Sequence, residues 1–216
     1  MNHLIAPSML ASDFGNLKSE INMVNNSDAD WFHLDIMDGV FVPNISYGMP
    51  IMKTIKKYAK KPLDVHLMIE KPERYIEVFA QHGADILTVH FEACNHLHRT
   101  IEAIKKSGMQ AGVAINPHTN PMALLDVSVN IDVVCVMSVN PGFGGQSFIQ
   151  NTYKKIEVLK KIKKDSGSKY LIEVDGGVNL ENYKKIINCG ANILVAGSSV
   201  FNTKDPIQTI KKLKEF

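Results

Sequence analysis

The segment that most constrains the fold is residues 31–39, WFHLDIMDG, which has the pattern of a buried strand running into a turn. Because side chains alternate across a strand, His33, Asp35 and Met37 share one face, and apolar residues occupy the other. An imidazole and a carboxylate are costly to bury unless they are paired, hydrogen-bonded or bound to a metal ion. The segment therefore predicts a strand that carries polar chemistry into an apolar interior.

Two other segments repeat this arrangement. Residues 63–68, LDVHLM, place His66 and Met68 on one strand face, and residues 170–177, YLIEVDGG, end in Asp175 before two glycines. Three predicted strands thus carry a His or Asp near their C-terminal ends, a pattern that calls for a common explanation.

Eight short apolar runs alternate with helix-period segments through the whole chain. Strands that are apolar on both faces need helices outside them, which indicates a parallel sheet. Seven interleaved segments and one terminal segment have the pattern of helices, the one near residues 121–127 being short. A helix N-cap is expected at Asn179, and C-caps are expected near Gly83, Gly108 and Gly190. The predicted strands are residues 3–8, 31–36, 63–68, 86–91, 111–115, 132–137, 170–174 and 192–196.

An internal repeat favours closure of this sheet. HGADILTVH at residues 82–90 resembles CGANILVAG at residues 189–197, half a chain away, and SDADWFHLD at residues 27–35 is a looser copy. Eight βα units with half-chain similarity predict a closed (β/α)₈ TIM barrel, formed by residues 1–216 as a single domain. The alternative is an open doubly wound sheet, which is disfavoured because no GxGxxG motif follows the first strand.

Composition narrows the class of partner. The 216 residues are 45% hydrophobic and 21% charged, and the net charge of +2 is too small to predict nucleic-acid binding. Three cysteines without a CxxC pair predict reduced thiols. No apolar run approaches the roughly 18 residues of a membrane span, and the N-terminus lacks a signal-peptide pattern. We expect a cytoplasmic protein with no membrane or nucleic-acid partner.

Catalytic groups of such barrels lie at the C-terminal ends of the strands. Two imidazoles and two carboxylates from three strands could converge there on one divalent ion, Zn²⁺, Fe²⁺, Mn²⁺ or Co²⁺. The alternative is that each His is a satisfied core residue and each Asp caps a loop. The expected ligands are His33, Asp35, His66 and Asp175.

Other polar residues receive different interpretations. Asp64 and Glu173 share the inward phase but lie deeper, so we interpret them as polar groups of the barrel floor. His90, at the end of the fourth strand, is left open between core and site. A surface position is expected for His3, His82, His96, His98 and His118.

Glycine-rich turns follow the last three strands. Glycine lets backbone approach an anion closely, and barrels often bind phosphate after strands seven and eight. The alternative is that these are only tight turns. The long loop after strand six, VNPGFGGQSF, has the composition of a lid with an apolar tip. The expected phosphate and lid residues are Gly142, Phe143, Gly144, Gly145, Gly176, Gly177, Gly197, Ser198 and Ser199.

Methionines stand at three strand ends. Scattered methionines usually fill core gaps, but Met37, Met68 and Met137 each close a strand at the catalytic end. An apolar cap over the reacting carbon is therefore an equally good interpretation.

Taken together, these motifs resemble the ribulose-phosphate 3-epimerase family, also called pentulose-5-phosphate 3-epimerases. The resemblance covers the whole chain, and its most specific phrases are HLDIMDGVFVPN and SVNPGFGGQSF, with APSMLASDF, DVHLMI, HFEA, VDGGVN and VAGSSVF in the same order. It implies a phosphate-binding barrel with one divalent metal ion that inverts C3 of D-ribulose 5-phosphate to give D-xylulose 5-phosphate, a step of the pentose phosphate pathway. The partner would be a small sugar phosphate, and we expect a homo-oligomer.

The resemblance also assigns roles to residues. It implies that Asp35 and Asp175 are both metal ligands and the acid/base pair, and that Ser8 and His66 contact substrate. It further implies that the three methionines cap the site and that phosphate lies against the glycine turns. Inversion through a cis-enediolate needs one acid on each face of C3, and carboxylates on strands two and seven can supply this.

Three other functions stay open at this point. Related enzymes act on allulose 6-phosphate with nearly the same site, so the sugar length is less certain than the reaction. A decarboxylase or aldolase of the same barrel type usually needs a lysine at a strand end, and no predicted strand ends in one. A non-catalytic binder of phosphorylated metabolites would be excluded by metal-dependent proton exchange at C3.

Overall fold

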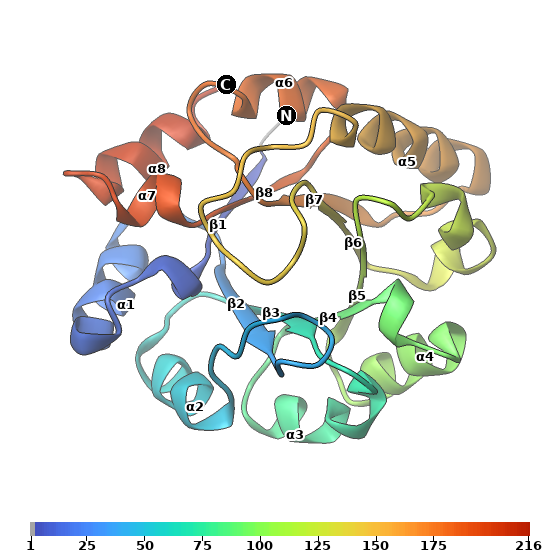
Figure 1. The fold of residues 1–216 in the computed structure, drawn as a ribbon, viewed down its shortest axis with the longest axis horizontal. Coiled ribbons are helices and arrows are strands. Elements are labelled where there is room, and N and C mark those ends of the chain that lie inside the picture. Colours follow the sequence, from blue (N-terminus) through green and yellow to red (C-terminus); the bar gives the residue numbers. More distant parts are fainter. Residues whose placement is uncertain (1–2) are drawn as a thin grey trace.

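A computed structural model describes residues 3–216, and eight parallel strands form its centre (Figure 1). Neighbours in the sheet follow the order β1-β8-β7-β6-β5-β4-β3-β2, as a (β/α)₈ barrel requires. The predicted barrel is thus confirmed, while residues 1–2 of the predicted domain lie outside the described part. The strands are β1 (Leu4–Pro7), β2 (Phe32–Met37), β3 (Leu63–Met68), β4 (Ile86–His90), β5 (Gln110–Ile115), β6 (Val133–Met137), β7 (Leu171–Asp175) and β8 (Ile193–Ala196).

Helices surround this ring and bury their apolar stripes against it (Figure 1). Six α-helices and one long 3-10 helix connect successive strands, and the terminal segment divides into two helices. The connecting helices are α1 (Leu17–Asn26), α2 (Met49–Tyr58), α3 (Ile76–Gln81), α4 (Leu97–Lys106), η5 (Pro121–Asn130), α5 (Thr152–Ser166) and α6 (Tyr183–Cys189), followed by α7 (Ser198–Phe201) and α8 (Pro206–Lys214). Shorter 3-10 turns are η1 (Met9–Ala11), η2 (Phe14–Asn16), η3 (Pro72–Arg74) and η4 (Phe91–Ala93).

The periodicity of the sequence explains the outer core. Leu17, Ile21 and Val24 of α1 are buried at helical spacing, as are Ile156 and Leu159 of α5. On the strands, alternate residues pack against these helices and the others fill the barrel. Because both faces are covered, the strands carry few exposed residues.

The barrel closes through a thin seam between β1 and β2. Ile5 O accepts the N–H groups of Asp30 and Trp31 at 2.8 and 3.3 Å, and Ser8 forms an isolated parallel bridge with His33. The end of β1 is therefore brought beside the start of β2, where the polar face predicted from WFHLDIMDG begins.

Two local predictions are corrected. An N-cap at Asn179 predicts a helix that begins at Leu180, but helix α6 begins three residues later, at Tyr183. The side chain of Asn179 instead accepts the N–H groups of Glu181 and Asn182 in the turn before the helix. His3, expected on the surface, is 3% exposed because its Nε2 pairs with Leu213 O at 2.6 Å under α8.

Within residues 3–216, none of the helices has the length and hydropathy needed to cross a membrane.

Candidate active site

The β2–β3 register places the polar residues of these strands beside one another. Asp35 pairs with His66, His33 with Asp64, and Met37 with Met68. Because all of these are inward positions, the pairing forms two polar layers inside the barrel with a methionine layer above them. Asp64 belongs to the lower layer, as predicted for the barrel floor.

The four expected metal ligands meet at one point. His33 Nε2 lies 3.3 Å from Asp35 Oδ1 and 3.8 Å from Asp175 Oδ2. His66 Nδ1 lies 3.3 and 3.5 Å from the same two oxygens. One donor atom from each of the four residues falls within 4.8 Å of the others. This spacing suits a single ion held by two imidazoles and two carboxylates.

The two imidazoles provide the test of fit. His33 Nε2 and His66 Nδ1 are buried and have no hydrogen-bond partner among residues 3–216. Such orphaned nitrogens are costly in an interior unless something accepts their lone pairs. The other nitrogen of each ring is engaged: His33 Nδ1 with Asp64 Oδ2 at 2.6 Å, and His66 Nε2 with His90 Nε2 at 2.9 Å. The arrangement fits a divalent cation.

Charges in this cluster depend on one another. Burial disfavours protonation of His33, but Asp35 and Asp64 outweigh it and raise the pKa of His33 well above its usual value. Burial also disfavours ionisation of Asp35, yet the His33 and His66 rings hold the pKa of that carboxyl well below its usual range. Positive charge at this point therefore stabilises an ionised Asp35, and a metal ion would provide it as well as an imidazolium does.

Glu173 lies below the cluster and behaves differently. Burial and the neighbouring Asp64 raise the pKa of Glu173 well above its usual value. Neither carboxyl oxygen has a hydrogen-bond partner within the described chain. A neutral Glu173 is consistent with its predicted place on the barrel floor.

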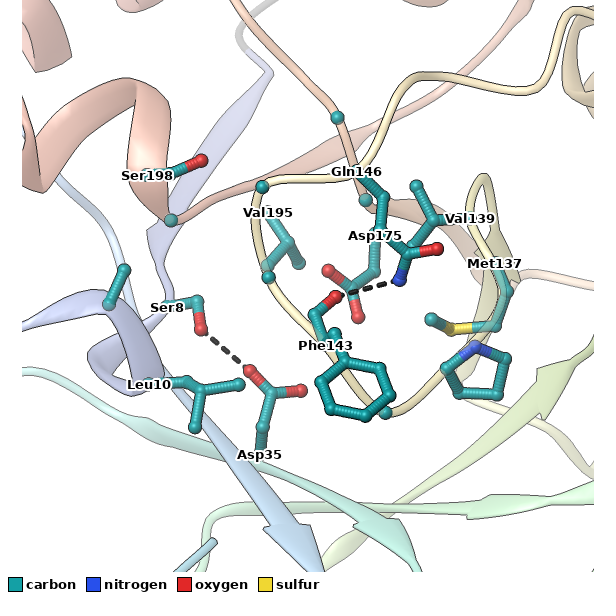
Figure 2. Close-up of a pocket in the computed structure, with 18 of the residues that line it drawn as sticks. Ser8, Leu10, Asp35, Met137, Val139, Phe143, Gln146, Asp175, Val195 and Ser198 are labelled. Atoms are coloured by element: carbon teal, nitrogen blue, oxygen red, sulfur yellow. Dashed lines mark hydrogen bonds between the residues drawn. The ribbon is translucent and has the colours of Figure 1, made fainter. Parts of the chain in front are cut away.

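Ser8 reaches the cluster across the seam between β1 and β2. Its hydroxyl donates to Asp35 Oδ2 at 2.6 Å, as Figure 2 shows. Asp35 Oδ1 faces the two imidazoles, so the two oxygens of this carboxylate have different neighbours. Only closure of the barrel brings Ser8 to this position.

A cavity of about 150 Å³ opens above the cluster at the C-terminal ends of the strands. Asp35 and Asp175 both line it (Figure 2). His33 and His66 lie beneath with no exposed surface. Every other residue expected to contact substrate also lines the cavity: Ser8, Met37, Met68, Met137, Gly142, Phe143, Gly144, Gly145, Gly176, Gly177, Gly197, Ser198 and Ser199.

The turn after β7 requires glycine for steric reasons. Gly176 has φ +115°, and a Cβ there would lie 2.4 Å from Val139 Cγ2. Gly177 has φ +63°, and its Cβ would lie 2.9 Å from Gln146 O and Phe148 N. These glycines thus pack backbone of the β7 turn directly against the loop that follows β6.

The loop between β6 and α5 crosses the mouth of the barrel as the golden segment of Figure 1. Phe143 at its tip is 54% exposed although it also lines the cavity. Gln146 Nε2 donates to Asn140 O at 2.7 Å and to Phe143 O at 2.8 Å, which ties the loop to itself. Figure 2 shows the second of these hydrogen bonds. Asn44 Nδ2 donates to Gly142 O at 2.8 Å, which joins the loop to the segment after β2.

Sequence reasoning missed several residues of the site. It did not identify Asp64 as the hydrogen-bond partner of His33. It also assigned no role to the His90–Glu92 pair or to Ser138. Ser138 Oγ donates to Asp175 O at 2.8 Å and to Gly176 O at 2.5 Å, which fixes the end of β7. The spacing of His90 and Glu92 in HFEA was an available signal, because His90 is the last residue of β4 and Glu92 follows two residues later.

The sequence and the fold are both similar to those of known proteins. The sequence model described as "Ribulose-phosphate 3 epimerase family" matches residues 4–201. The chain belongs to the ribulose-phosphate 3-epimerase family. A relative from Bacillus subtilis (strain 168), named ribulose-phosphate 3-epimerase, is 50% identical over 211 residues, covering 97% of each chain. The Escherichia coli (strain K12) protein of the same name is 41% identical and covers 98% of this chain and 95% of its own.

Distant structures share the fold. The 3-hexulose-6-phosphate synthase of Salmonella typhimurium has a TM-score of 0.73 at 18% identity, covering 98% of this chain and 96% of its own. The orotidine 5'-phosphate decarboxylase of Pyrococcus horikoshii OT3 has a TM-score of 0.71 at 13% identity, covering 98% and 97%. At these identities the likeness establishes the barrel and nothing about the reaction.

Proposed function

We propose that the protein inverts C3 of D-ribulose 5-phosphate to give D-xylulose 5-phosphate with the aid of one divalent metal ion. The observation that carries this proposal is the pair Asp35 and Asp175, which come from β2 and β7 and line one cavity beside two orphaned imidazole nitrogens. Membership of the family and the names of relatives at 41–50% identity support it.

Inversion at C3 needs two proton transfers on opposite faces. The C3 proton lies next to the C2 carbonyl, so one carboxylate removes it to give a cis-enediolate and the other returns a proton to the opposite face. Asp35 Oδ2, which accepts from Ser8, is turned away from the imidazoles and can take the first role. Asp175 presents Oδ2 to the imidazoles, which leaves Oδ1 for the second.

The proposed metal ligands are His33 Nε2, Asp35 Oδ1, His66 Nδ1 and Asp175 Oδ2. A bound Zn²⁺, Fe²⁺, Mn²⁺ or Co²⁺ would supply positive charge that stabilises the enediolate and its precursor carbonyl. Since the same carboxylates would hold the ion, their charge is partly neutralised, and the site gains more from stabilising the intermediate than from strong bases.

The other residues that line the cavity would bind the substrate and exclude water from it. The turns at Gly176-Gly177 and at Gly197–Ser199 border one side, and we propose that the phosphate lies there against backbone N–H groups. Remote phosphate binding positions C3 between the acids. Met37, Met68 and Met137 form an apolar surface over the reacting carbon, and closure of the Phe143 loop would exclude water.

The test is an epimerisation assay on ribulose 5-phosphate and allulose 6-phosphate after removal of metal and readdition of each candidate ion. We expect metal-dependent activity with a preference for the pentulose. His66→Ala should lose stoichiometric metal and most activity while the barrel stays folded, with His98→Ala, an exposed histidine of α4, as the control. Turnover by chelated wild type, or stoichiometric metal in His66→Ala, would contradict the proposed centre. Preference for allulose 6-phosphate would favour the hexulose enzyme instead.

We also propose that the protein is cytoplasmic and forms a homo-oligomer. Three free cysteines in the described chain suit a reducing compartment. Exposed apolar side chains such as Val40, Ile45 and Val129 supply surface that an interface would bury. Light scattering in solution measures the mass, and a monomer at all concentrations would contradict the oligomer.

A further inference from the structure

A chain of buried hydrogen bonds continues outward from His66 on the side away from the cavity. His66 Nε2 lies 2.9 Å from His90 Nε2, and the two rings stack with centroids 5.0 Å apart. His90 Nδ1 lies 3.2 Å from Glu92 Oε2. Neither imidazole has exposed surface. The chain thus links Glu92, through two rings, to the nitrogen of His66 that faces the proposed metal.

Glu92, at the outer end of this series of hydrogen bonds, constrains where the hydrogens lie on the two imidazole rings. An ionised carboxylate only accepts, so His90 Nδ1 must carry the hydrogen that Glu92 receives. In a neutral His90 this leaves Nε2 as an acceptor, and only one hydrogen fits between the facing nitrogens. His66 must then donate from Nε2, which leaves Nδ1 with its lone pair directed at Asp35 and Asp175.

Glu92 is itself held in the accepting role. Its Oε1 accepts the N–H of Asn116 at 2.8 Å and the hydroxyl of Thr119. The backbone of this segment is fixed from α5, because the buried Lys155 Nζ donates to Asn116 O and Thr119 O at 2.7 Å each. With Oε1 engaged by two donors, Oε2 is the oxygen left for His90.

We infer that His90 and Glu92 are positioning residues that fix the tautomer of His66, so that its Nδ1 lone pair is presented to the divalent ion. Neither residue lines the substrate cavity, and neither is among the four ligands. The inference rests on the proposed metal centre and adds to it a hydrogen-bond relay from Glu92. Partners of this kind orient metal-bound histidines and raise metal affinity.

Glu92→Gln separates this role from simple packing. The amide has nearly the shape of the carboxylate, and its oxygen will take the Oε1 position because Asn116 and Thr119 both donate there. Its NH₂ group then faces His90 Nδ1 and donates to it. His90 must carry hydrogen on Nε2, His66 must accept on Nε2, and the hydrogen of His66 moves to Nδ1, where it blocks the ion.

The measurement is the Zn²⁺ dissociation constant, obtained by chelator competition from the zinc-loaded protein. We expect Glu92→Gln to raise it by about 10- to 100-fold. The matched control is Glu102→Gln, which alters the exposed His98–Glu102 pair of α4 and should leave the constant unchanged. Thermal unfolding of metal-free Glu92→Gln establishes that the barrel is folded.

A second pair of variants tests His90 without relying on Glu92. His90→Gln can still accept from His66 Nε2 through its amide oxygen, whereas His90→Leu cannot, so His90→Gln should retain most of the zinc affinity that His90→Leu loses. In zinc-loaded wild type, imidazole ¹⁵N spectra should show hydrogen on Nδ1 of His90 and on Nε2 of His66.

The outcomes separate the two proposals. Zinc binding by wild type no tighter than by His66→Ala would overturn the metal centre, and the relay with it. Tight wild-type binding that Glu92→Gln leaves unchanged, equal losses in His90→Gln and His90→Leu, or hydrogen on Nε2 of His90 would each overturn the relay alone.

Discussion

His33 Nδ1 lies 2.6 Å from Asp64 Oδ2, and neither side chain has exposed surface. The carboxylate therefore occupies one ring nitrogen and turns the other, Nε2, toward Asp35 and Asp175. His33 and His66 thus present opposite ring nitrogens to the same point, Nε2 from one and Nδ1 from the other. The other nitrogen of each ring has a different partner, Asp64 for His33 and His90 for His66.

Replacing Asp64 should weaken the metal centre without touching the substrate cavity. In Asp64→Leu, His33 Nδ1 loses its acceptor and the ring loses its preferred tautomer. We expect metal affinity to fall about 10- to 100-fold, measured by chelator competition. Asp126→Asn, an exposed carboxylate on η5, is the control. Unchanged affinity in a folded Asp64→Leu would show that Asp64 only fills the barrel floor.

Asp35 and Asp175 should serve opposite faces of C3. In D₂O the wild type should place solvent deuterium at C3 of the product, because the returned proton is not the one removed. Asp35→Asn and Asp175→Asn should almost stop epimerisation, yet each should still exchange the C3 proton of the epimer that presents it to the surviving acid. NMR of the two pure epimers measures this exchange, and opposite epimer preferences are expected.

The interpretation of that exchange depends on metal content. Both aspartates are proposed ligands, so metal must be measured in each variant alongside the exchange rate. With metal retained, the same epimer preference in both variants would contradict the assignment of one acid to each face. A single shuttling base would then explain the reaction.

Ser199→Glu should obstruct the proposed phosphate position. Ser199 lines the cavity, and its hydroxyl is buried without a partner among the described residues. A carboxylate there would face the phosphate, and like charges brought together cost several kcal/mol, so KM should rise by about a hundredfold or more. Asn202→Glu, exposed at the end of α7, adds the same charge outside the cavity and should change KM little. An unchanged KM in Ser199→Glu would make the turn structural only.

The hydrogen bonds to Glu92 should make the stability of the folded state depend on pH under acidic conditions. Burial opposes ionisation of Glu92, but hydrogen bonds from His90, Thr119 and Asn116 lower its pKa to about 2, against about 4.3 in an unfolded chain. Its ionised form therefore stabilises the folded state above pH of about 4.3, and this contribution is lost as the pH falls toward 2.

The comparison is between metal-free wild type and Glu92→Gln in thermal unfolding from pH 7 to pH 3. Wild type should melt higher at pH 7, and the difference should narrow as the pH falls. Glu102→Gln should run parallel to wild type throughout. A difference between wild type and Glu92→Gln that stays constant over this range would contradict the lowered pKa.

Much of the architecture follows from local pattern. Each observed strand begins and ends within one residue of its predicted bounds, because alternation and apolar runs are read directly from the chain. The expected C-cap at Gly83 has the positive φ that a helix end requires. The start of α6 was predicted less well, since Asn179 can cap a turn as readily as a helix.

The histidines show where pattern is insufficient. His3 was expected on the surface, yet α8, more than two hundred residues later, supplies the carbonyl that satisfies it. The position of His90 was left open because its partners, His66 and Glu92, lie on different elements. Burial of a polar side chain depends on what the rest of the chain places beside it, and spacing alone does not contain that information.

By itself the sequence determined that β2, β3 and β7 would carry imidazoles and carboxylates at their C-terminal ends, since phase along a strand decides which face each side chain takes. It also determined where glycine would allow close turns. Only the tertiary structure decided which nitrogen of each histidine faces the site, and that Ser8 would bond Asp35. Those contacts join residues on separate strands, and barrel closure brings these together at hydrogen-bond distance.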